Sequence, residues 1–117
     1  MTEKHMTEKQ EKKAAVIAFT AEGKRLAEKI ISKLQENGYL CTSYHKMMDS
    51  LISWAGEQFS AVQVLVFVGA AGIAVRAIAP WVKDKFTDPA VVVVDEMGKF
   101  VIPILSGHLG GANDFAR

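Results

Sequence analysis

The sequence predicts an α/β domain with a three-layer α/β/α architecture, in which a mixed, mainly parallel five-stranded sheet ends in a hairpin. Two observations support this prediction. Between residues 14 and 82, short apolar runs of strand length alternate with segments of helical periodicity, which is typical of β-α-β units. Two later apolar runs, at 91–94 and 99–105, are separated only by Asp95-Glu96-Met97-Gly98, and so short a connector favours an antiparallel pair.

The first strand and the first helix have the clearest signals. Residues 14–19 form an apolar run that predicts a buried strand. Thr20 can cap the following helix, in which apolar side chains from Leu26 to Leu34 recur at helical spacing and charged residues occupy the other faces. Asn37-Gly38 then ends the helix, because these residue types favour a helix C-terminus.

The middle of the chain repeats this alternation. A weaker strand is predicted over 39–44, and a helix over the apolar stripe at 47–59. The run 62–68 is apolar at almost every position, as expected for a central strand that is covered on both faces. A short helix over 70–79 should end near Pro80.

Size and composition limit the class of protein. With 117 residues the chain is predicted to be one domain, over 14–117, behind a disordered tail at 1–13. A net charge of +1 does not favour binding to nucleic acid or to an anionic membrane. The single cysteine, Cys41, fits a reducing cytoplasm, and the apolar stretch 62–82 is interrupted by polar residues and glycines, unlike a membrane span.

The glycines of Gly69-Ala70-Ala71-Gly72 and the nearby Arg76 are the first candidate site residues. The glycines fall where a predicted central strand meets a helix, an edge at which open α/β sheets bind ligands; close packing of strand and helix is the alternative. Arg76 is the only charge in 70–82, so it either forms a structural ion pair or presents its guanidinium to a ligand carboxylate. The candidate ion-pair partners are Asp84, Asp88 and Asp95.

The acidic pair after the 91–94 strand is the second candidate. Neighbouring residues of a strand point to opposite faces, so at most one of the two carboxylates can reach a given site. Asp95 directly follows the strand and is the better functional candidate, whereas Glu96 fits a local role in the turn.

The third candidate is the run 106–113, Ser-Gly-His-Leu-Gly-Gly-Ala-Asn, which lies between a predicted strand and a helix that should begin at Gly110. Its three glycines favour close approach of the backbone to an anionic ligand, although their spacing matches neither a dinucleotide-binding nor a Walker loop. His108 is a candidate for proton transfer near neutral pH, and a solvent-facing loop histidine is the alternative. The histidines of the chain are too scattered to predict a metal site.

Three motifs together resemble one enzyme family. They are G-I-A-V-R-A-I-A-P at 72–80, D-P-A-V-V-V-V-D-E at 88–96 and L-S-G-H-L-G-G-A-N at 105–113. In this order they are similar to the amino-terminal domain of the CbiG family, the cobalt-precorrin-5A hydrolases of anaerobic cobalamin biosynthesis. The resemblance is dense over 69–113 and looser over 14–60.

The resemblance implies a cytoplasmic hydrolase that opens the δ-lactone of a cobalt-containing corrinoid precursor and releases two carbons as acetaldehyde. It implies no separate cofactor, because the substrate carries the cobalt. The macrocycle is fringed with carboxylates, which suits recognition by glycine-rich loops, helix N-termini and an arginine. The predicted catalytic residues are His108 and Asp95. The predicted substrate-binding residues are Gly69, Gly72, Arg76, Ser106, Gly107, Gly110, Gly111 and Asn113.

Family members usually continue into a carboxy-terminal domain that is absent from these residues, so that domain is a predicted partner, and a homodimer is left open. Two alternatives to hydrolysis also stay open. One is a non-catalytic tetrapyrrole-binding or scaffold domain, with catalysis in the absent part. The other is a nucleotide-binding domain that uses the loop at 107–111.

Overall fold

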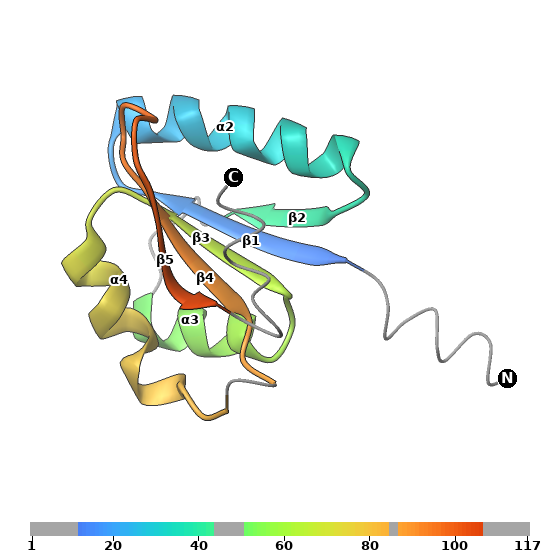
Figure 1. Ribbon diagram of the computed structural model, residues 1–117, viewed down its shortest axis with the longest axis vertical. Helices are drawn as coiled ribbons and strands as arrows, with labels where there is room; N and C mark the ends of the chain where they lie inside the picture. Colours follow the sequence, from blue (N-terminus) through green and yellow to red (C-terminus); the bar gives the residue numbers. More distant parts are fainter. Residues whose placement is uncertain (1–11, 44–50, 85–86, 107–117) are drawn as a thin grey trace, which may run out of the picture.

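The computed structural model describes residues 12–43, 51–84 and 87–106. Strands and helices alternate along it, as the sequence predicts (Figure 1). The strands are β1 (Lys13–Ala18), β2 (Leu40–Ser43), β3 (Val64–Val68), β4 (Ala90–Val94) and β5 (Val101–Ser106). The helices are α2 (Ala21–Glu36), α3 (Leu51–Phe59), α4 (Ala71–Ile78) and the short 3₁₀ helix η1 (Ala79–Trp81).

The five strands form one sheet in the order β2-β1-β3-β4-β5. The first four strands run parallel, and β5 pairs with β4 in the antiparallel direction. The register pairs Val66 with Val16 on one side and with Val92 on the other, so β1, β3 and β4 lie side by side. The predicted mixed sheet with a terminal hairpin is therefore confirmed.

Helices cover both faces of the sheet, with α2 on one face and α3 and α4 on the other (Figure 1). Side chains of the central strands alternate between the two apolar layers: Val66 packs in the layer beneath α2, and Phe67 in the layer beneath α3 and α4. Because both faces are covered, these strands are apolar at every position. The valines that the sequence predicts to be buried are buried: Val64, Val66, Val68, Val92 and Val94.

The longest helix, α2, begins and ends where its capping residues predict. At its start the Gly23 N–H donates to Oγ1 of Thr20 at 2.9 Å, so the threonine satisfies one of the N–H groups that a helix leaves unpaired. At its end Asn37 is the C-cap, and Gly38 takes a φ of +89°, a conformation that glycine adopts without steric cost.

The sheet begins slightly earlier than predicted. The Lys13 N–H donates to Oε1 of Gln63 at 2.6 Å, and the Lys12 carbonyl accepts from the Leu40 N–H at 2.8 Å. These hydrogen bonds attach the last two residues of the predicted tail to the sheet. The rest of that tail, residues 1–11, lies outside the described residues.

Other element boundaries differ from the predicted ones by a few residues. The helix predicted over 70–79 is α4 followed by η1, since Pro80 lacks the N–H that would continue an α-helix. The helix predicted over 47–59 is described from Leu51, and the helix predicted from Gly110 lies outside the described residues.

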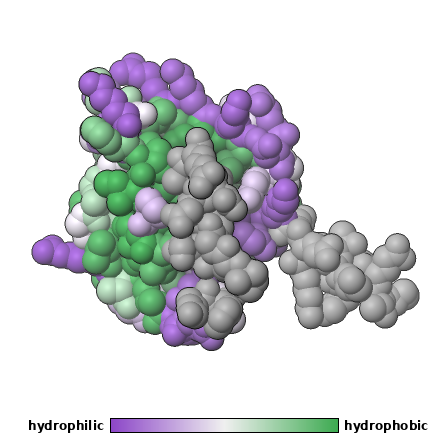
Figure 2. All heavy atoms as spheres, in the orientation of Figure 1, coloured by the Kyte–Doolittle hydropathy of each residue, from purple (hydrophilic) through white to green (hydrophobic). Residues whose placement is uncertain are grey.

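The face of the molecule seen in the view of Figure 1 has a hydrophilic part and a hydrophobic part. Figure 2 shows a hydrophilic band along α2 and a hydrophobic area on the side that carries β5. Phe100 and Ile102 are 66% and 53% exposed there, just before and within β5. Within the described ranges, no helix is long and apolar enough to cross a membrane.

Candidate functional site at the carboxyl edge of the sheet

The chain changes direction between β1 and β3. The connection after β1 enters α2 on one face of the sheet, and the connection after β3 enters α4 on the other face, although the two strands are neighbours. Ligands of open α/β sheets bind outside the carboxyl ends of strands at such a switch point. We call the edge at which β1, β3 and β4 end the carboxyl edge, and the opposite one the amino edge.

The turn from β3 to α4 is shaped by backbone conformations with positive φ. Gly69 has a φ of +85°, and its N–H donates to the Val94 carbonyl at 2.7 Å. Ala70 follows in the left-handed conformation, with φ 58° and ψ 60°, and gives α4 no side-chain cap. The first N–H groups of α4 therefore have no partner within the helix, and a Cβ added at Gly72 would meet open space.

A polar contact joins two loops at this edge. The hydroxyl of Thr20 donates to Oε2 of Glu96 at 2.8 Å, which ties the β1–α2 connection to the β4–β5 turn. A Cβ built on Gly69 would lie 3.0 Å from both Cγ and Oε2 of Glu96, so only a glycine leaves room for this carboxylate. Thr20, Gly69 and Glu96 form what we call the edge cluster.

Asp95 lies at the start of the turn between β4 and β5. Its Oδ2 accepts hydrogen bonds from the N–H groups of Met97 at 3.2 Å and Lys99 at 3.3 Å, so its carboxylate closes the hairpin turn. Glu96 is the acidic residue that reaches the switch point, although the sequence favoured Asp95 for the site and Glu96 for the turn. The sequence holds one usable signal, the opposite orientation of adjacent strand residues, but that signal does not say which of the two faces Thr20.

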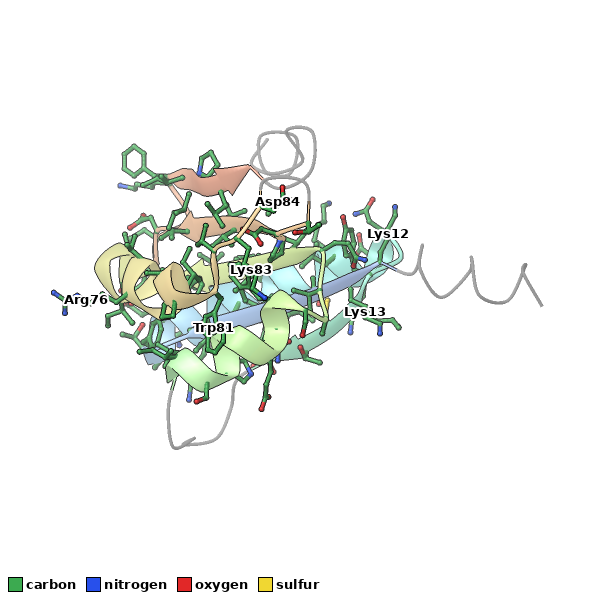
Figure 3. The ribbon with its side chains drawn as sticks, turned by 90° about the horizontal axis from the view of Figure 1, so that it is seen from below. Lys12, Lys13, Arg76, Trp81, Lys83 and Asp84 are labelled. Atoms are coloured by element: carbon green, nitrogen blue, oxygen red, sulfur yellow. The ribbon has the colours of Figure 1, made fainter. Side chains whose placement is uncertain are left out.

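Arg76 lies on the outer face of α4, opposite the buried Ala74 and Ala77. Figure 3 shows its side chain pointing outward at the end of the molecule opposite Lys12 and Lys13, which mark the beginning of β1. Arg76 therefore projects on the same side as the carboxyl edge.

The structural ion pair that the sequence left open for Arg76 does not form with any described residue. The carboxylate of Asp88 instead accepts from the Lys83 N–H at 2.8 Å and the Asp84 N–H at 3.1 Å, which orders the loop before β4. The guanidinium of Arg76 is exposed to solvent.

The third predicted motif starts from the other edge. Because β5 is antiparallel, Ser106 pairs with Ala90 at the beginning of β4, whereas Val101 pairs with Val94 at its end. Ser106 is thus about 13 Å from the carboxyl edge, at about 3.3 Å per residue. The remaining predicted site residues of this motif lie outside the described residues: Gly107, His108, Gly110, Gly111 and Asn113.

A cavity of about 220 Å³ lies at the amino edge. Its wall includes the ring of Trp81, the side chains of Lys83 and Thr87, and the carboxylate of Asp88, which is already hydrogen-bonded. The Trp81 ring lies directly over Gly56, where an added Cβ would be 2.5 Å from ring atoms. Sequence reasoning did not point to this cavity.

A smaller groove, of about 130 Å³, lies beneath α2 and reaches the carboxyl ends of β1 and β2 through Ala18 and Ser43. Lys24 and Glu28 of α2 line its open side. In the part of the chain that the structure describes, no three His, Cys, Asp or Glu side chains are close enough together to hold a metal ion.

Comparison with known proteins gives consistent matches. The family model described as "Cobalamin synthesis G N-terminal" matches residues 53–117. The cobalt-precorrin-5A hydrolase of Salmonella typhimurium is 48% identical over 85 residues, which cover 73% of this chain and 23% of that protein. The cobalt-precorrin-5A hydrolase of Priestia megaterium is 36% identical over 114 residues, which cover 88% of this chain and 30% of that protein.

A solved structure agrees with these matches. The crystal structure of a protein described as a cobalamin biosynthesis protein G homolog from Sulfolobus solfataricus superposes with a TM-score of 0.69 at 29% identity. The match covers 92% of this chain and 32% of the Sulfolobus solfataricus protein. This chain therefore matches only about a quarter to a third of the length of each of the three relatives. Since the family model matches more than half of its residues, the chain belongs to the cobalamin synthesis G N-terminal family, as its three motifs predict.

Proposed function

We propose that this domain is part of a cobalt-precorrin-5A hydrolase of cobalamin biosynthesis and that the corrinoid contacts its carboxyl edge. The names of the Salmonella typhimurium and Priestia megaterium relatives support the reaction. The observation that supports the location is the edge cluster of Thr20, Gly69 and Glu96, which lies at the switch point of the sheet.

Recognition of the substrate's carboxylates is the first task of this edge. The first N–H groups of α4, which have no partner within the helix, attract anions, and the open space at Gly72 allows a ligand to approach the backbone closely. Arg76 is exposed beyond the same edge, and its planar guanidinium can bind a carboxylate with two hydrogen bonds. Both features suit a macrocycle fringed with carboxylates.

The loop after β5 supplies the remaining proposed groups. His108 is proposed for proton transfer, and Ser106, Gly107, Gly110, Gly111 and Asn113 for binding the substrate. The last residue of β5, Ser106, pairs with Ala90 at the amino edge, and the loop continues from there outside the described residues. Asp95, whose carboxylate closes the hairpin turn, contributes by holding Glu96 at the carboxyl edge.

The test measures the release of acetaldehyde from cobalt-precorrin-5A under anaerobic conditions. The released acetaldehyde is reduced enzymatically, and the accompanying oxidation of NADH is monitored. Two preparations are compared: the 117-residue chain alone and the same chain joined to the carboxy-terminal part of the Salmonella typhimurium relative. That carboxy-terminal part alone is the control. Release that requires the present chain is the expected result.

Binding of the corrinoid, measured by equilibrium dialysis, separates the remaining alternatives. Binding without release in both preparations indicates a non-catalytic tetrapyrrole-binding or scaffold domain. Absence of both binding and release contradicts the proposal. Neither the family nor the relatives favour the nucleotide-binding alternative.

A further inference from the structure

We propose that Glu96 is the catalytic base that activates water for opening of the lactone. This inference rests on the proposed hydrolase function. It adds to the carboxyl edge a catalytic residue, Glu96, for which the sequence indicated only a local role in the turn. The supporting features are the position of the carboxylate, its hydrogen bonding and the donors beside it.

Among the described residues, Glu96 is hydrogen-bonded at only one carboxylate oxygen. Its side chain is partly buried, and Oε2 accepts the hydroxyl hydrogen of Thr20 at 2.8 Å. Among the described residues, no donor or cation lies within bonding distance of Oε1. A base needs this combination, because one oxygen fixes the orientation while the other accepts a proton from water.

A purely structural role explains the contact less well, since both elements that it joins are closed without it. The cap of α2 is made by the lone pair with which Thr20 Oγ1 accepts the Gly23 N–H. The hairpin turn is closed by Asp95, whose carbonyl accepts the Gly98 N–H at 2.7 Å. The hydroxyl hydrogen of Thr20 is thus directed to a carboxylate that neither element requires.

The neighbouring turn supplies what a developing oxyanion requires. Glu96 Cγ and Oε2 lie directly over Gly69, one residue before Ala70 and the first N–H groups of α4, which have no partner within the helix. In the proposed complex the lactone carbonyl accepts from these N–H groups and its acyl carbon faces the carboxylate of Glu96. Donors aimed at a developing oxyanion stabilise the tetrahedral intermediate of acyl transfer.

The proposed step is balanced in atoms and charge. Glu96 takes a proton from water as the water oxygen bonds to the acyl carbon of the lactone. The tetrahedral intermediate then collapses, the bond from the acyl carbon to the ring oxygen breaks, and the alkoxide that leaves receives the proton from Glu96. The product is the hydroxy acid, and the carboxylate returns to its starting state.

Glu96→Gln separates the catalytic role from the structural one. The glutamine carbonyl still accepts from the Thr20 hydroxyl, so the contact between the loops is kept, but an amide cannot take a proton from water. We expect kcat for acetaldehyde release to fall by about 10²–10⁴-fold, the usual contribution of a general base, with KM and the unfolding midpoint unchanged. The matched control is Glu57→Gln on the exposed face of α3, which should leave kcat, KM and the midpoint unchanged.

Substitutions of Thr20, a positioning residue for Glu96, provide a second test. Thr20→Ser keeps the hydroxyl and should retain kcat, whereas Thr20→Ala should lower kcat by less than Glu96→Gln does and also weaken the α2 cap. If Glu96→Gln retains wild-type kcat in a preparation that releases acetaldehyde, Glu96 is not the base and the hydrolase proposal stands. If the wild-type preparation releases none, the hydrolase proposal and the role of Glu96 fail together.

Discussion

Each edge of the sheet has a glycine covered by a side chain from a distant part of the sequence, and the two arrangements differ in kind. At the amino edge Gly56 of α3 lies under the indole ring of Trp81. At the carboxyl edge Gly69 lies under the carboxylate of Glu96. An aromatic ring over a glycine contributes packing, whereas a carboxylate over a glycine can also interact with a ligand.

The amino-edge contact is made by a packed and hydrogen-bonded ring. The Trp81 indole N–H donates to the Ile52 carbonyl at 2.8 Å, and the ring packs against the core cluster beneath α3 and α4. The carboxyl-edge contact involves the far end of a flexible side chain, held by one hydrogen bond from Thr20. The comparison indicates that the amino edge contributes packing, whereas the carboxyl edge keeps a polar group in a place where a ligand can reach it.

The largest expected effect on stability is that of Gly56→Ala. The new Cβ would be 2.5 Å from the Trp81 ring, so the ring must move, and overpacking of this kind costs about 3 kcal/mol. Because alanine favours a helix by about 1 kcal/mol over glycine, we expect a net loss of about 2 kcal/mol in the free energy of unfolding by urea. Corrinoid affinity should not change. A loss of affinity in the folded variant would indicate that the corrinoid binds at the amino edge.

Gly69→Ala should have a smaller effect on stability and a larger one on function. The positive φ of Gly69 costs an alanine about 1 kcal/mol, and the Cβ at 3.0 Å pushes Glu96 aside without displacing the backbone. We therefore expect a modest fall in the urea midpoint and a fall in kcat for acetaldehyde release. Unchanged kcat together with a lowered midpoint would make Gly69 a purely conformational requirement.

The smallest expected effect concerns Cys41, which lies next to neither of these glycines and serves as a reference. Burial raises the pKa of its thiol, and its Sγ lies 4.0 Å from the Ile31 carbonyl. The folded state therefore holds the thiol proton to higher pH than the unfolded state does. Relative to Cys41→Ser, the stability of the wild type should be constant below about pH 8, near the ordinary thiol range, and should decrease as pH rises through the raised pKa.

The same decrease should occur in the backgrounds of Gly56→Ala and Gly69→Ala, measured by urea unfolding at each pH. If Gly69→Ala changes the slope of unfolding free energy against pH, the surroundings of Cys41 in β2 are coupled to the carboxyl edge. In that case the two glycine contacts could not be treated as independent of the rest of the sheet.

Most of the fold follows from local patterns. The strand and helix periodicities, the Thr20 cap and the Asn37-Gly38 end of α2 are signals within a few residues of one another, and the structure confirms them. The short connector between β4 and β5 predicted an antiparallel pair for the same reason. The boundary at Lys13 differs because it depends on Gln63 and Leu40, which lie elsewhere in the chain.

The candidate site was less predictable, because its contacts join distant residues. The hydrogen bond from Thr20 to Glu96 spans 76 residues, and no local pattern distinguishes Glu96 from Asp95. The direction of β5 is a further feature that decides which predicted residues can lie together, and it follows from the pairing of β5 with β4. An antiparallel last strand takes the chain back to the amino edge, which the hairpin prediction itself implies.

Pro103 in β5 has a consequence for how the domain behaves in concentrated solution. Among the described strands β5 has a neighbour on one side only, and its sequence from Phe100 to Leu105 contains no charge. Apolar edge strands tend to extend their ladder of backbone hydrogen bonds into a second molecule, and a proline, which lacks the N–H donor, interrupts such a ladder. At Pro103, therefore, β5 offers a second molecule no backbone N–H with which to extend the ladder.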